Sequence, residues 1–265
     1  MECKVAIVKL GGSLVTIKAK PLTPNMRAIT NLASCLSALR LRKDERLFLI
    51  HGGGSYGHYY AKKFGLSTRF TKSRPEAIAK ICNAMLELHS QILDAFTSNG
   101  FYCRSIDSAE LLSSGNSTLS GVSKRKVEDY LACGLTPLSY GNVFVSGQGA
   151  RIISGDEVCL ALARSLSVSR VIFAMDVDGV YSNPSLEGDV IPILNSVADV
   201  HSRVRRWDVT GGLGAKLKLG FEISRLGVDV CFLNGLFPDR IRKAISGGEN
   251  FRGSMIRASS GTLKE

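Results

Sequence analysis

The sequence lacks a long hydrophobic run and a leader-like segment. None of its apolar stretches approaches the roughly 20 residues that a membrane-spanning helix needs. The first residues, Met1 to Lys4, lead directly into a short apolar run and do not have the shape of a signal peptide. We therefore expect a cytoplasmic protein that has no membrane partner.

Patterns for disulfides and metal sites are also missing. The seven cysteines are scattered, their number is odd, and no two are spaced as Cys-x-x-Cys. The four histidines add no metal-ligand pattern. We expect most thiols to be small buried hydrophobic side chains, as at Cys159, in a reducing compartment and with no resident metal.

Signatures of nucleic-acid binding are absent, although the chain is basic. Lysine and arginine number 34 against 23 acidic residues, which gives a net charge of +11. The basic residues are dispersed, and no aromatic residues alternate with their short clusters at 40–43, 124–126 and 203–206. These clusters fit solvated faces, and charge alone does not separate nucleic acid, a membrane surface and small polyanions. Because no nucleic-acid module is recognisable, we expect no nucleic-acid partner.

The sequence does contain apolar segments that alternate between strand and helix patterns. Apolar residues make up 45% of the 265 residues, which is enough for a sizeable core. The patterns predict strands at 5–8, 46–50, 171–175 and 228–233, helices at 24–40, 75–98, 156–166 and 214–226, and a hairpin at 143–153. This alternation predicts an α/β fold with a mainly parallel central sheet covered by helices. No linker is visible, so we expect one domain over residues 1–265, with any division into lobes near 165–170.

Three glycine-rich turns follow predicted strands or open predicted helices. They lie at Lys9–Ser13, His51–His58 and Thr210–Lys216. Glycine allows the backbone to approach a ligand closely, and N–H groups at a helix start bind anions. One such turn can be merely a tight connection between elements. Three in one chain, two of them with a lysine, indicate a polyphosphate site.

Other ligand motifs are matched only in part. Gly52, Gly54 and Gly57 fit G-x-G-x-x-G, but Glu76 follows Pro75 at a predicted helix start rather than ending a strand, as a dinucleotide site requires. The segment 176–179 begins like a calcium loop, but its glycine comes two positions early. That segment instead ends a buried strand, where open α/β sheets bind ligands. A Walker A motif is absent.

Five motifs, in their order and spacing, resemble the amino acid kinase superfamily over essentially the whole chain. They are Lys-Leu-Gly-Gly-Ser at 9–13, His-Gly-Gly-Gly at 51–54, Ile-Ser-Gly-Asp at 153–156, Asp-Val-Asp-Gly-Val-Tyr at 176–181 and Thr-Gly-Gly-x-x-x-Lys at 210–216. Within this superfamily, the Gly-Gly-Gly-Ser-Tyr-Gly-His segment ending in His58, together with Lys18, is similar to the isopentenyl phosphate kinases. The resemblance implies a three-layer αβα sandwich whose two lobes share one sheet. Residues of about 1–165 would bind the acceptor, and those of about 166–265 the nucleotide.

The resemblance implies that the charged residues carry out phosphoryl transfer, which depends mainly on positioning and charge neutralisation. Lys9 and Lys216 would hold the nucleotide phosphates, and Lys18 would stabilise the transition state. Asp156 would orient the lysines and oppose their mutual repulsion. Each lysine could instead be an ordinary solvated side chain, and Asp156 is also well placed to cap the 156–166 helix. The acceptor phosphate is itself a nucleophile, so no general base is expected.

The resemblance also implies two sets of ligand contacts, with ATP and Mg²⁺ as cofactors. Beside the lysines, the nucleotide would contact Gly11, Gly12, Ser13, Gly54, Asp176, Tyr181 and Gly212. The acceptor would contact Gly53, Gly155 and His58, whose imidazole would donate to the substrate phosphate. A nearby dianion favours protonated histidine, whose ordinary pKa is about 6.5. A histidine at this place could instead cap a helix or pack in the core.

An isoprenoid substrate needs an apolar pocket. The helix at 75–98 carries a stripe that could line it or simply pack in the core, namely Ile78, Cys82, Met85 and Ile92. Asn142 stands where many relatives have aspartate, which leaves the contacts of the hairpin open.

The resemblance implies ATP-dependent phosphorylation of isopentenyl phosphate to isopentenyl diphosphate, in an alternative mevalonate route of isoprenoid biosynthesis, by a homodimer. Two alternatives stay open. One is a kinase of the same superfamily that acts on another small phosphate, phosphonate or carboxylate. The other is a nucleotide-sensing or nucleic-acid-binding regulator that exploits the +11 charge.

Overall fold

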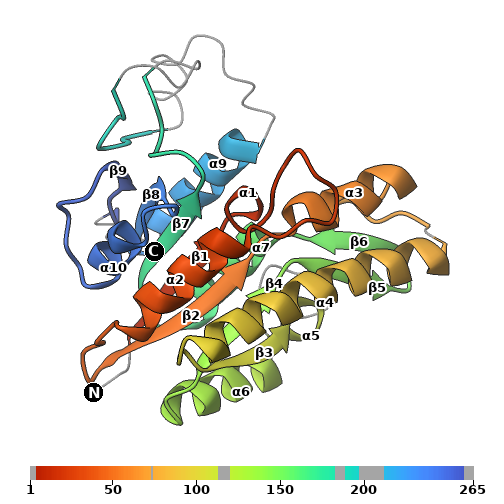
Figure 1. The fold of residues 1–265 in the computed structure, drawn as a ribbon, viewed down its shortest axis with the longest axis horizontal. Helices are drawn as coiled ribbons and strands as arrows, with labels where there is room; N and C mark the ends of the chain where they lie inside the picture. Colours follow the sequence, from red (N-terminus) through yellow and green to blue (C-terminus); the bar gives the residue numbers. More distant parts are fainter. Residues whose placement is uncertain (1–3, 73, 113–119, 183–188, 197–211, 260–265) are drawn as a thin grey trace, which may run out of the picture.

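The computed structural model describes residues 4–72, 74–112, 120–182, 189–196 and 212–259 (Figure 1). Its strands are β1 (Lys4–Leu10), β2 (Glu45–His51), β3 (Cys103–Asp107), β4 (Thr136–Tyr140), β5 (Asn142–Ser146), β6 (Gly149–Ile153), β7 (Val168–Met175), β8 (Asp229–Asn234) and β9 (Gly253–Ile256). Its helices are α1 (Gly12–Val15), α2 (Met26–Ser37), α3 (Gly54–Phe64), α4 (Pro75–Ser98), α5 (Ser108–Leu111), α6 (Gly121–Ala132), α7 (Gly155–Ser165), α9 (Gly212–Ser224) and α10 (Pro238–Ile245).

A seven-stranded sheet forms the centre of the fold, with strand order β3-β4-β2-β1-β7-β8-β9. All neighbouring strands are parallel except β9, which runs antiparallel to β8. Strands β5 and β6 form a separate antiparallel hairpin, as the sequence predicts. The predicted α/β fold with a mainly parallel sheet is confirmed.

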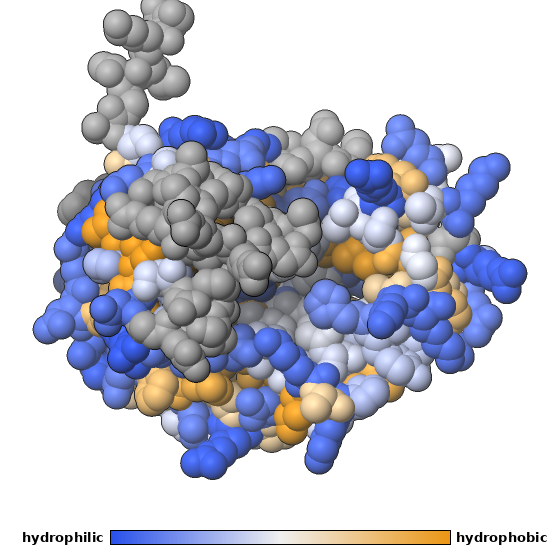
Figure 2. Space-filling view, turned by 90° about the horizontal axis from the view of Figure 1, so that it is seen from above, coloured by the Kyte–Doolittle hydropathy of each residue, from blue (hydrophilic) through white to orange (hydrophobic). Residues whose placement is uncertain are grey.

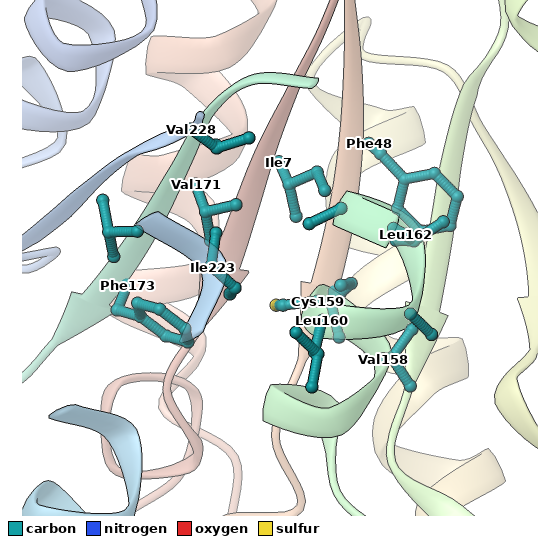
Figure 3. Packing of buried hydrophobic residues seen from close by; sticks show 14 of the residues in the cluster. Ile7, Phe48, Val158, Cys159, Leu160, Leu162, Val171, Phe173, Ile223 and Val228 are labelled. Atoms are coloured by element: carbon teal, nitrogen blue, oxygen red, sulfur yellow. The ribbon is translucent and has the colours of Figure 1, made fainter. Parts of the chain in front are cut away.

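Alternating side chains of the sheet build two cores, one on each face. Ile7 and Phe48 belong to one cluster, in which they pack with residues of α7 such as Leu162 (Figure 3). Val8 and Leu49, the next residues along the same strands, belong to the other cluster, which includes residues of α2 and α4. Successive residues of a strand point to opposite faces, so a sheet covered on both sides is apolar throughout. These two cores are the physical basis of the αβα sandwich.

The long helix α4 occupies the predicted residues. Pro75 stands in its first turn, where its missing N–H costs no hydrogen bond, and Gly100 follows its end with φ +74°. In contrast, β3 and β4 are not predicted from the sequence. Both are short, and β4 contains Pro137, a residue that argues against a strand inside a sheet. None of the described helices is long and apolar enough to cross a membrane.

The cap of α7 differs from the prediction. Helix α7 begins at Gly155, and its N-cap is Ser154, whose side chain accepts a hydrogen bond from the Glu157 amide at 3.1 Å. Asp156 therefore stands inside the first turn and is not the cap. Its carboxylate is free to bind other side chains while still lying near the positive end of the helix dipole.

The thiols are less buried than the sequence suggests. Of the described cysteines, Cys159 and Cys231 are buried, Cys133 is exposed, and Cys35, Cys82 and Cys103 are partly exposed. All six are free, so no disulfide forms among them.

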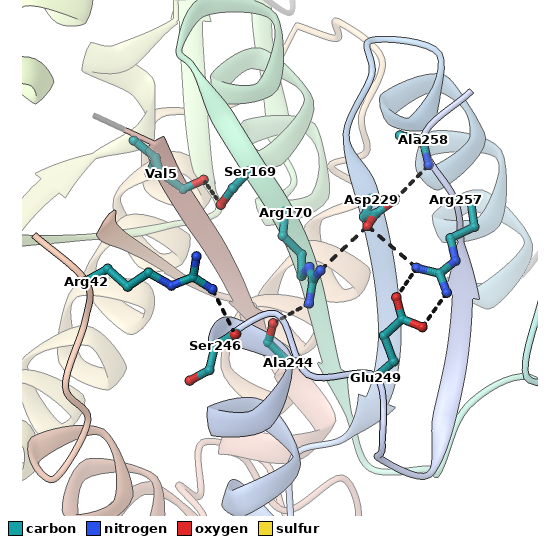
Figure 4. A network of polar contacts seen from close by, with 10 residues as sticks. All are labelled: Val5, Arg42, Ser169, Arg170, Asp229, Ala244, Ser246, Glu249, Arg257 and Ala258. Carbon is teal, nitrogen blue, oxygen red and sulfur yellow. Dashed lines mark hydrogen bonds and ion pairs between the residues drawn. The ribbon is translucent and has the colours of Figure 1, made fainter. Parts of the chain in front are cut away.

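Part of the positive charge stabilises the fold. Arg170 on β7 donates to the Ala244 carbonyl of α10 at 2.6 Å and lies 3.6 Å from the carboxylate of Asp229 on β8 (Figure 4). Arg257 pairs with Glu249 and approaches the same aspartate (Figure 4). These arginines connect β7, β8 and α10 through ion pairs and a hydrogen bond to a backbone carbonyl.

Candidate active site

The predicted site residues gather at the carboxyl ends of three adjacent strands. Strand β1 ends before Gly11, β2 ends before Gly52, and β7 ends before Asp176. These strands are neighbours in the sheet, and the carboxyl ends of parallel strands form the usual ligand-binding edge of an α/β fold. In the space-filling view from above, the coloured surface is mostly hydrophilic, with smaller apolar patches (Figure 2).

The first two glycine turns pack directly against each other. A Cβ atom on Gly12 would lie 2.3 Å from the Gly54 amide nitrogen, and Gly54 itself has φ +47°. Thr16 fastens the two turns, because its hydroxyl donates to the Gly12 carbonyl at 2.7 Å and accepts from the Ser55 amide at 2.9 Å. Only glycine fits such an approach without displacing backbone. Thr16 has no motif of its own and was missed in the sequence analysis.

Asp156 joins two of the predicted lysines. Its Oδ1 lies 2.9 Å from the Lys9 Nζ of β1, and its Oδ2 lies 2.9 Å from the Lys216 Nζ of α9. Lys9 is only 5% exposed, so its charge is held inside the protein. Burial alone would raise the pKa of Asp156, but the two ammonium groups lower it to about 2. The three residues therefore form a fixed charge cluster with one net positive charge.

Lys18 does not join this cluster. Its Nζ lies 2.8 Å from Oδ2 of Asp176, whose Oδ1 accepts the Ser13 hydroxyl at 2.6 Å. The Lys18 side chain is 70% exposed, which leaves it free to change partners when a ligand binds. Burial would raise the pKa of Asp176, but hydrogen bonds from Lys18 and Ser13 lower it. The sequence predicts Ser13, Lys18 and Asp176 as site residues without predicting that they contact one another.

His58 lies in α3 and interacts electrostatically with the two lysines of the charge cluster. Its pKa is lowered by partial burial and by the positive charges of Lys216 and Lys9. Without a ligand the imidazole is therefore driven toward its neutral form. A phosphate dianion placed between these groups would reverse that effect.

The apolar stripe of α4 is divided between two clusters. Ile78, Cys82 and Met85 pack in a cluster with Tyr140 and Val143. The Met85 Sδ packs against the glycine turn before α3, 2.8 Å from the position that a Cβ on Gly53 would occupy. Ile92, farther along α4, packs in the core that includes α2 and not in this cluster, which is the core-packing alternative for that residue.

Three further predicted residues, Gly155, Gly212 and Tyr181, lie within the described part of the chain. Gly155 lies over the Lys9 side chain, whose Cε is 3.6 Å from the position of a glycine Cβ. The Gly212 carbonyl accepts from the Lys216 ammonium at 3.3 Å, whereas Thr210 and Gly211 of the same motif lie outside the described residues. Tyr181 is 9% exposed and pairs through its backbone with Val190.

Asp178 is a second charged centre that the sequence analysis did not use. Its carboxylate accepts from Arg240 at 2.5 Å, from Arg252 at 2.8 Å and from the Asn234 amide at 3.2 Å. The signal was present in the Asp-x-Asp pattern, but its basic partners come from distant segments. Asn142, at the start of the hairpin, is buried and donates to Asp107 at 2.7 Å.

The donor set of the site fits a nucleotide-borne metal better than a resident one. The described residues contain no group of three or more His, Cys, Asp or Glu side chains that could hold a metal ion. Asp156 and Asp176 already form ion pairs with lysine ammonium groups. Mg²⁺ usually keeps several waters and binds through one or two carboxylates plus substrate phosphates. The site thus suits a magnesium ion that the nucleotide phosphates would hold.

Comparison with known proteins identifies the family. The model of the amino acid kinase family matches residues 4–234. The chain belongs to the amino acid kinase family. As a member of this family the chain is a kinase, which accounts for lysines and glycine turns at the edge of the sheet.

Several isopentenyl phosphate kinases resemble this chain over most of their length. An isopentenyl phosphate kinase of Thermoplasma acidophilum is 29% identical over 255 residues, which cover 95% of this chain and 99% of the relative. One of Haloferax volcanii is 32% identical over 221 residues, with 81% of this chain and 86% of the relative covered. A crystal structure of the T. acidophilum isopentenyl phosphate kinase product complex has a TM-score of 0.77 and 27% identity, and covers 96% of this chain and 100% of that one.

Proposed function

We propose that the protein transfers the γ-phosphoryl group of ATP to isopentenyl phosphate and so forms isopentenyl diphosphate. The observation that carries this proposal is the position of His58. It lies within the field of Lys9 and Lys216, on a helix whose glycine turn packs on Met85 of the apolar cluster. A phosphate monoester with an apolar tail has the charge and the shape for such a place.

The transfer needs no base from the protein. An oxygen of the acceptor phosphate attacks the γ-phosphorus of ATP, the bond from that phosphorus to the β–γ bridging oxygen breaks, and ADP leaves with the electron pair. Positioning and neutralisation of charge supply most of the catalysis in such reactions. Lys9 and Lys216 would hold the nucleotide phosphates, and Lys18 would leave Asp176 to follow the moving phosphoryl group.

Asp156 would set the positions of the two clamp lysines. It holds both ammonium groups at 2.9 Å, and without it their charges would repel each other in a poorly solvated place. Because its pKa is lowered to about 2, it stays ionised at neutral pH. Asp156 therefore serves as a positioning residue and not as a proton acceptor.

On the acceptor side, the phosphate would lie between His58 and the backbone N–H groups of Gly53 and Gly155. The apolar tail would extend toward the cluster of Ile78, Cys82, Met85, Tyr140 and Val143. Residues of α4 and of the hairpin strand β5 form the wall of this cluster. The cluster would therefore exclude water from one side of the reacting phosphates.

On the nucleotide side, Gly11, Gly12, Ser13 and Gly54 would surround the phosphates, with Mg²⁺ bound to the same phosphates and neutralising charge between them. Asp176, Tyr181 and Gly212 would lie nearer the rest of the nucleotide. We assign acceptor binding to about residues 1–165, which contain β1 to β6, and nucleotide binding to about 166–265, which contain β7 to β9.

A coupled assay of ADP release over a panel of acceptors tests the proposed function. The panel contains isopentenyl phosphate, an unbranched alkyl monophosphate, inorganic phosphate, UMP and N-acetylglutamate. We expect the highest kcat/KM for isopentenyl phosphate and a lower value for the unbranched alkyl monophosphate, because these two acceptors combine a phosphate with an apolar tail but differ in the shape of that tail. A higher kcat/KM for UMP or for the carboxylate would instead assign the chain to another kinase of the family.

A further inference from the structure

A buried pair of histidines lies directly beneath the second glycine turn. His51, the last residue of β2, is 0% exposed, and His89 in α4 is 1% exposed. The His51 Nε2 lies 3.0 Å from the His89 Nδ1. At the two ends of the pair, the His51 Nδ1 lies 3.2 Å from the Gly52 carbonyl, and the His89 Nε2 lies 2.8 Å from the Ser105 hydroxyl of β3. The contacts form one continuous chain from the edge of the sheet to the glycine turn.

Both rings are neutral in this environment. Burial and the neighbouring His89 lower the pKa of His51 to about 3, and burial lowers that of His89 to about 4. Lys9 is the charged group that faces His51, and its ammonium also opposes protonation. A neutral imidazole has one N–H donor and one bare nitrogen acceptor. Each ring therefore donates on one side only.

This neutrality leaves a single direction for the chain of hydrogen bonds. The Gly52 carbonyl can only accept, so the His51 Nδ1 must carry the proton and the His51 Nε2 must accept. The His89 Nδ1 then donates to His51, and the His89 Nε2 accepts the proton of the Ser105 hydroxyl. The Gly52 carbonyl thus fixes which nitrogen of His51 is protonated, and the Ser105 hydroxyl, which can donate or accept, completes the chain as a donor.

Tyr140 keeps the two rings in place. Its ring stacks on His51 at a centroid distance of 5.4 Å and lies 4.3 Å from His89. Its hydroxyl donates to Asp107 at 3.3 Å, and the same carboxylate accepts from Asn142. Both histidine rings therefore pack against the aromatic ring of β4, which limits their rotation.

The hydrogen bond to Gly52 bears on the site through the geometry of the peptide. A trans peptide is planar, so a fixed Gly52 carbonyl also fixes the Gly53 N–H, which points the opposite way. Within the described part of the chain, this N–H has no protein acceptor. Gly53 is also the residue to which the proposed function assigns the acceptor phosphate.

We propose that His51, held in one tautomer by its hydrogen bonds to the Gly52 carbonyl and to His89, is the positioning residue that aims the Gly53 N–H at the acceptor phosphate. The proposal rests on the proposed function for the identity of the acceptor. It gives His51, the histidine of the His-Gly-Gly-Gly motif, a role distinct from that of His58. His51 acts through the backbone and does not touch the substrate.

Two substitutions of His51 separate positioning from mere packing. His51→Asn places an amide N–H where the Nδ1–H stood, whereas His51→Gln places one near the Nε2 and loses the bond to Gly52. Both lose the ring stack, so we expect similar drops in Tm. We expect His51→Gln to lose about 10- to 100-fold in kcat/KM for isopentenyl phosphate with an unchanged KM for ATP. His51→Asn should recover most of this loss, and equal losses in the two variants would overturn the proposal.

The role of His89 is tested in the same way. His89→Leu removes the donor to the His51 Nε2, which helps to hold the ring in place, and we expect a several-fold loss of kcat/KM. His89→Asn keeps an amide N–H toward the His51 Nε2 and should restore it. Leu88→Val, one residue earlier in α4 and buried in the other core, is the control for loss of stability. If it lowers kcat/KM as much as His89→Leu does at the same Tm, the proposed positioning role is wrong.

Nitrogen NMR of the wild-type protein tests the tautomers without any substrate. We expect both His51 and His89 to be neutral between pH 5.5 and 8, because their pKa values are lowered to about 3 and about 4. The hydrogen bonds then require the proton on Nδ1 of each ring. An Nε2–H tautomer of His51 would overturn the proposal, whatever the substrate. Failure of the wild type to use isopentenyl phosphate would instead overturn the proposed function and leave the tautomer result standing.

Discussion

The Lys9 ammonium lies 2.9 Å from Oδ1 of Asp156, at the carboxyl end of the central strand β1 and the start of α7. The same carboxylate holds Lys216 through its other oxygen. The ends of three elements that are far apart in the sequence are thereby fixed to one another by charge. A buried ion pair is a weak source of net stability, but it is costly to break on one side only. The cluster therefore serves to preorganise the phosphate clamp.

Removal of either clamp lysine should abolish most of the turnover. We expect Lys9→Met and Lys216→Met each to lower kcat by about 10²–10³, which is the usual effect of removing one preorganised electrostatic contact. Steady-state kinetics at saturating substrates measures the loss, and circular dichroism checks the fold. Lys218→Met, on an exposed position of the same helix α9, is the matched control and should leave kcat unchanged. Near-normal turnover in both clamp variants would refute the proposed site.

Asp156 should make the protein sensitive to acid. Its pKa is about 2 in the folded state against an ordinary 3.8, so its stabilising contribution is full above pH 4 and is lost as the pH falls toward 2. A shift of this size corresponds to about 2 kcal/mol of unfolding free energy. We expect urea unfolding of the wild type to lose this amount between pH 5 and pH 2 beyond the loss shown by Asp156→Asn. If the unfolding free energies of the two proteins changed in parallel with pH, the low pKa of Asp156 would be contradicted.

His58 should bind the acceptor rather than the nucleotide. We expect His58→Ala to lower kcat/KM for isopentenyl phosphate by about 10- to 150-fold, the value of a hydrogen bond to a charged group, while the Kd of ATP stays nearly constant. His58→Gln keeps a hydrogen-bond donor without a charge, so its kcat/KM should lie between those of the wild type and His58→Ala. A purely structural histidine would instead lower Tm and weaken both ligands alike.

Proton uptake should accompany acceptor binding. Without ligand the pKa of His58 is lowered by partial burial and the two lysines, and a bound dianion raises it. Titration calorimetry of isopentenyl phosphate in buffers of different ionisation enthalpy, slightly below neutral pH, should therefore show protons taken up. His58→Gln should remove this uptake, and an identical uptake in both proteins would assign the proton to another group.

Lys18 should matter for turnover and not for stability. Its side chain is 70% exposed, and exposed ion pairs contribute only about 0–1 kcal/mol. We expect Lys18→Ala to keep the wild-type Tm and to lower kcat by about 10², since it removes a charge that would follow the phosphoryl group. Lys20→Ala, two residues farther along the same exposed segment, is the control. Equal activity of the two variants would show that Lys18 is an ordinary surface residue.

Much of the fold follows from the sequence, because its signals are local. The apolar runs of β1, β2 and β7 are long enough to predict buried strands, and α4 has both a periodic apolar face and a proline at its start. The order of the glycine turns then predicts which edge of the sheet binds phosphate. By contrast, β3 and β4 carry weak local signals, and they become strands because their neighbours in the sheet supply hydrogen-bond partners.

The sequence by itself determined the residue types of the site and their positions along the chain, since motifs and periodicity are properties of neighbouring residues. Only the tertiary structure decided their partners. It pairs Asp156 with Lys9 and Lys216 but leaves Lys18 to Asp176, and it makes Ser154 the helix cap. The chain from Ser105 through His89 to His51 likewise joins β3, α4 and β2. Such pairings depend on distances across the packed fold, which strand order and helix packing set and no local pattern encodes.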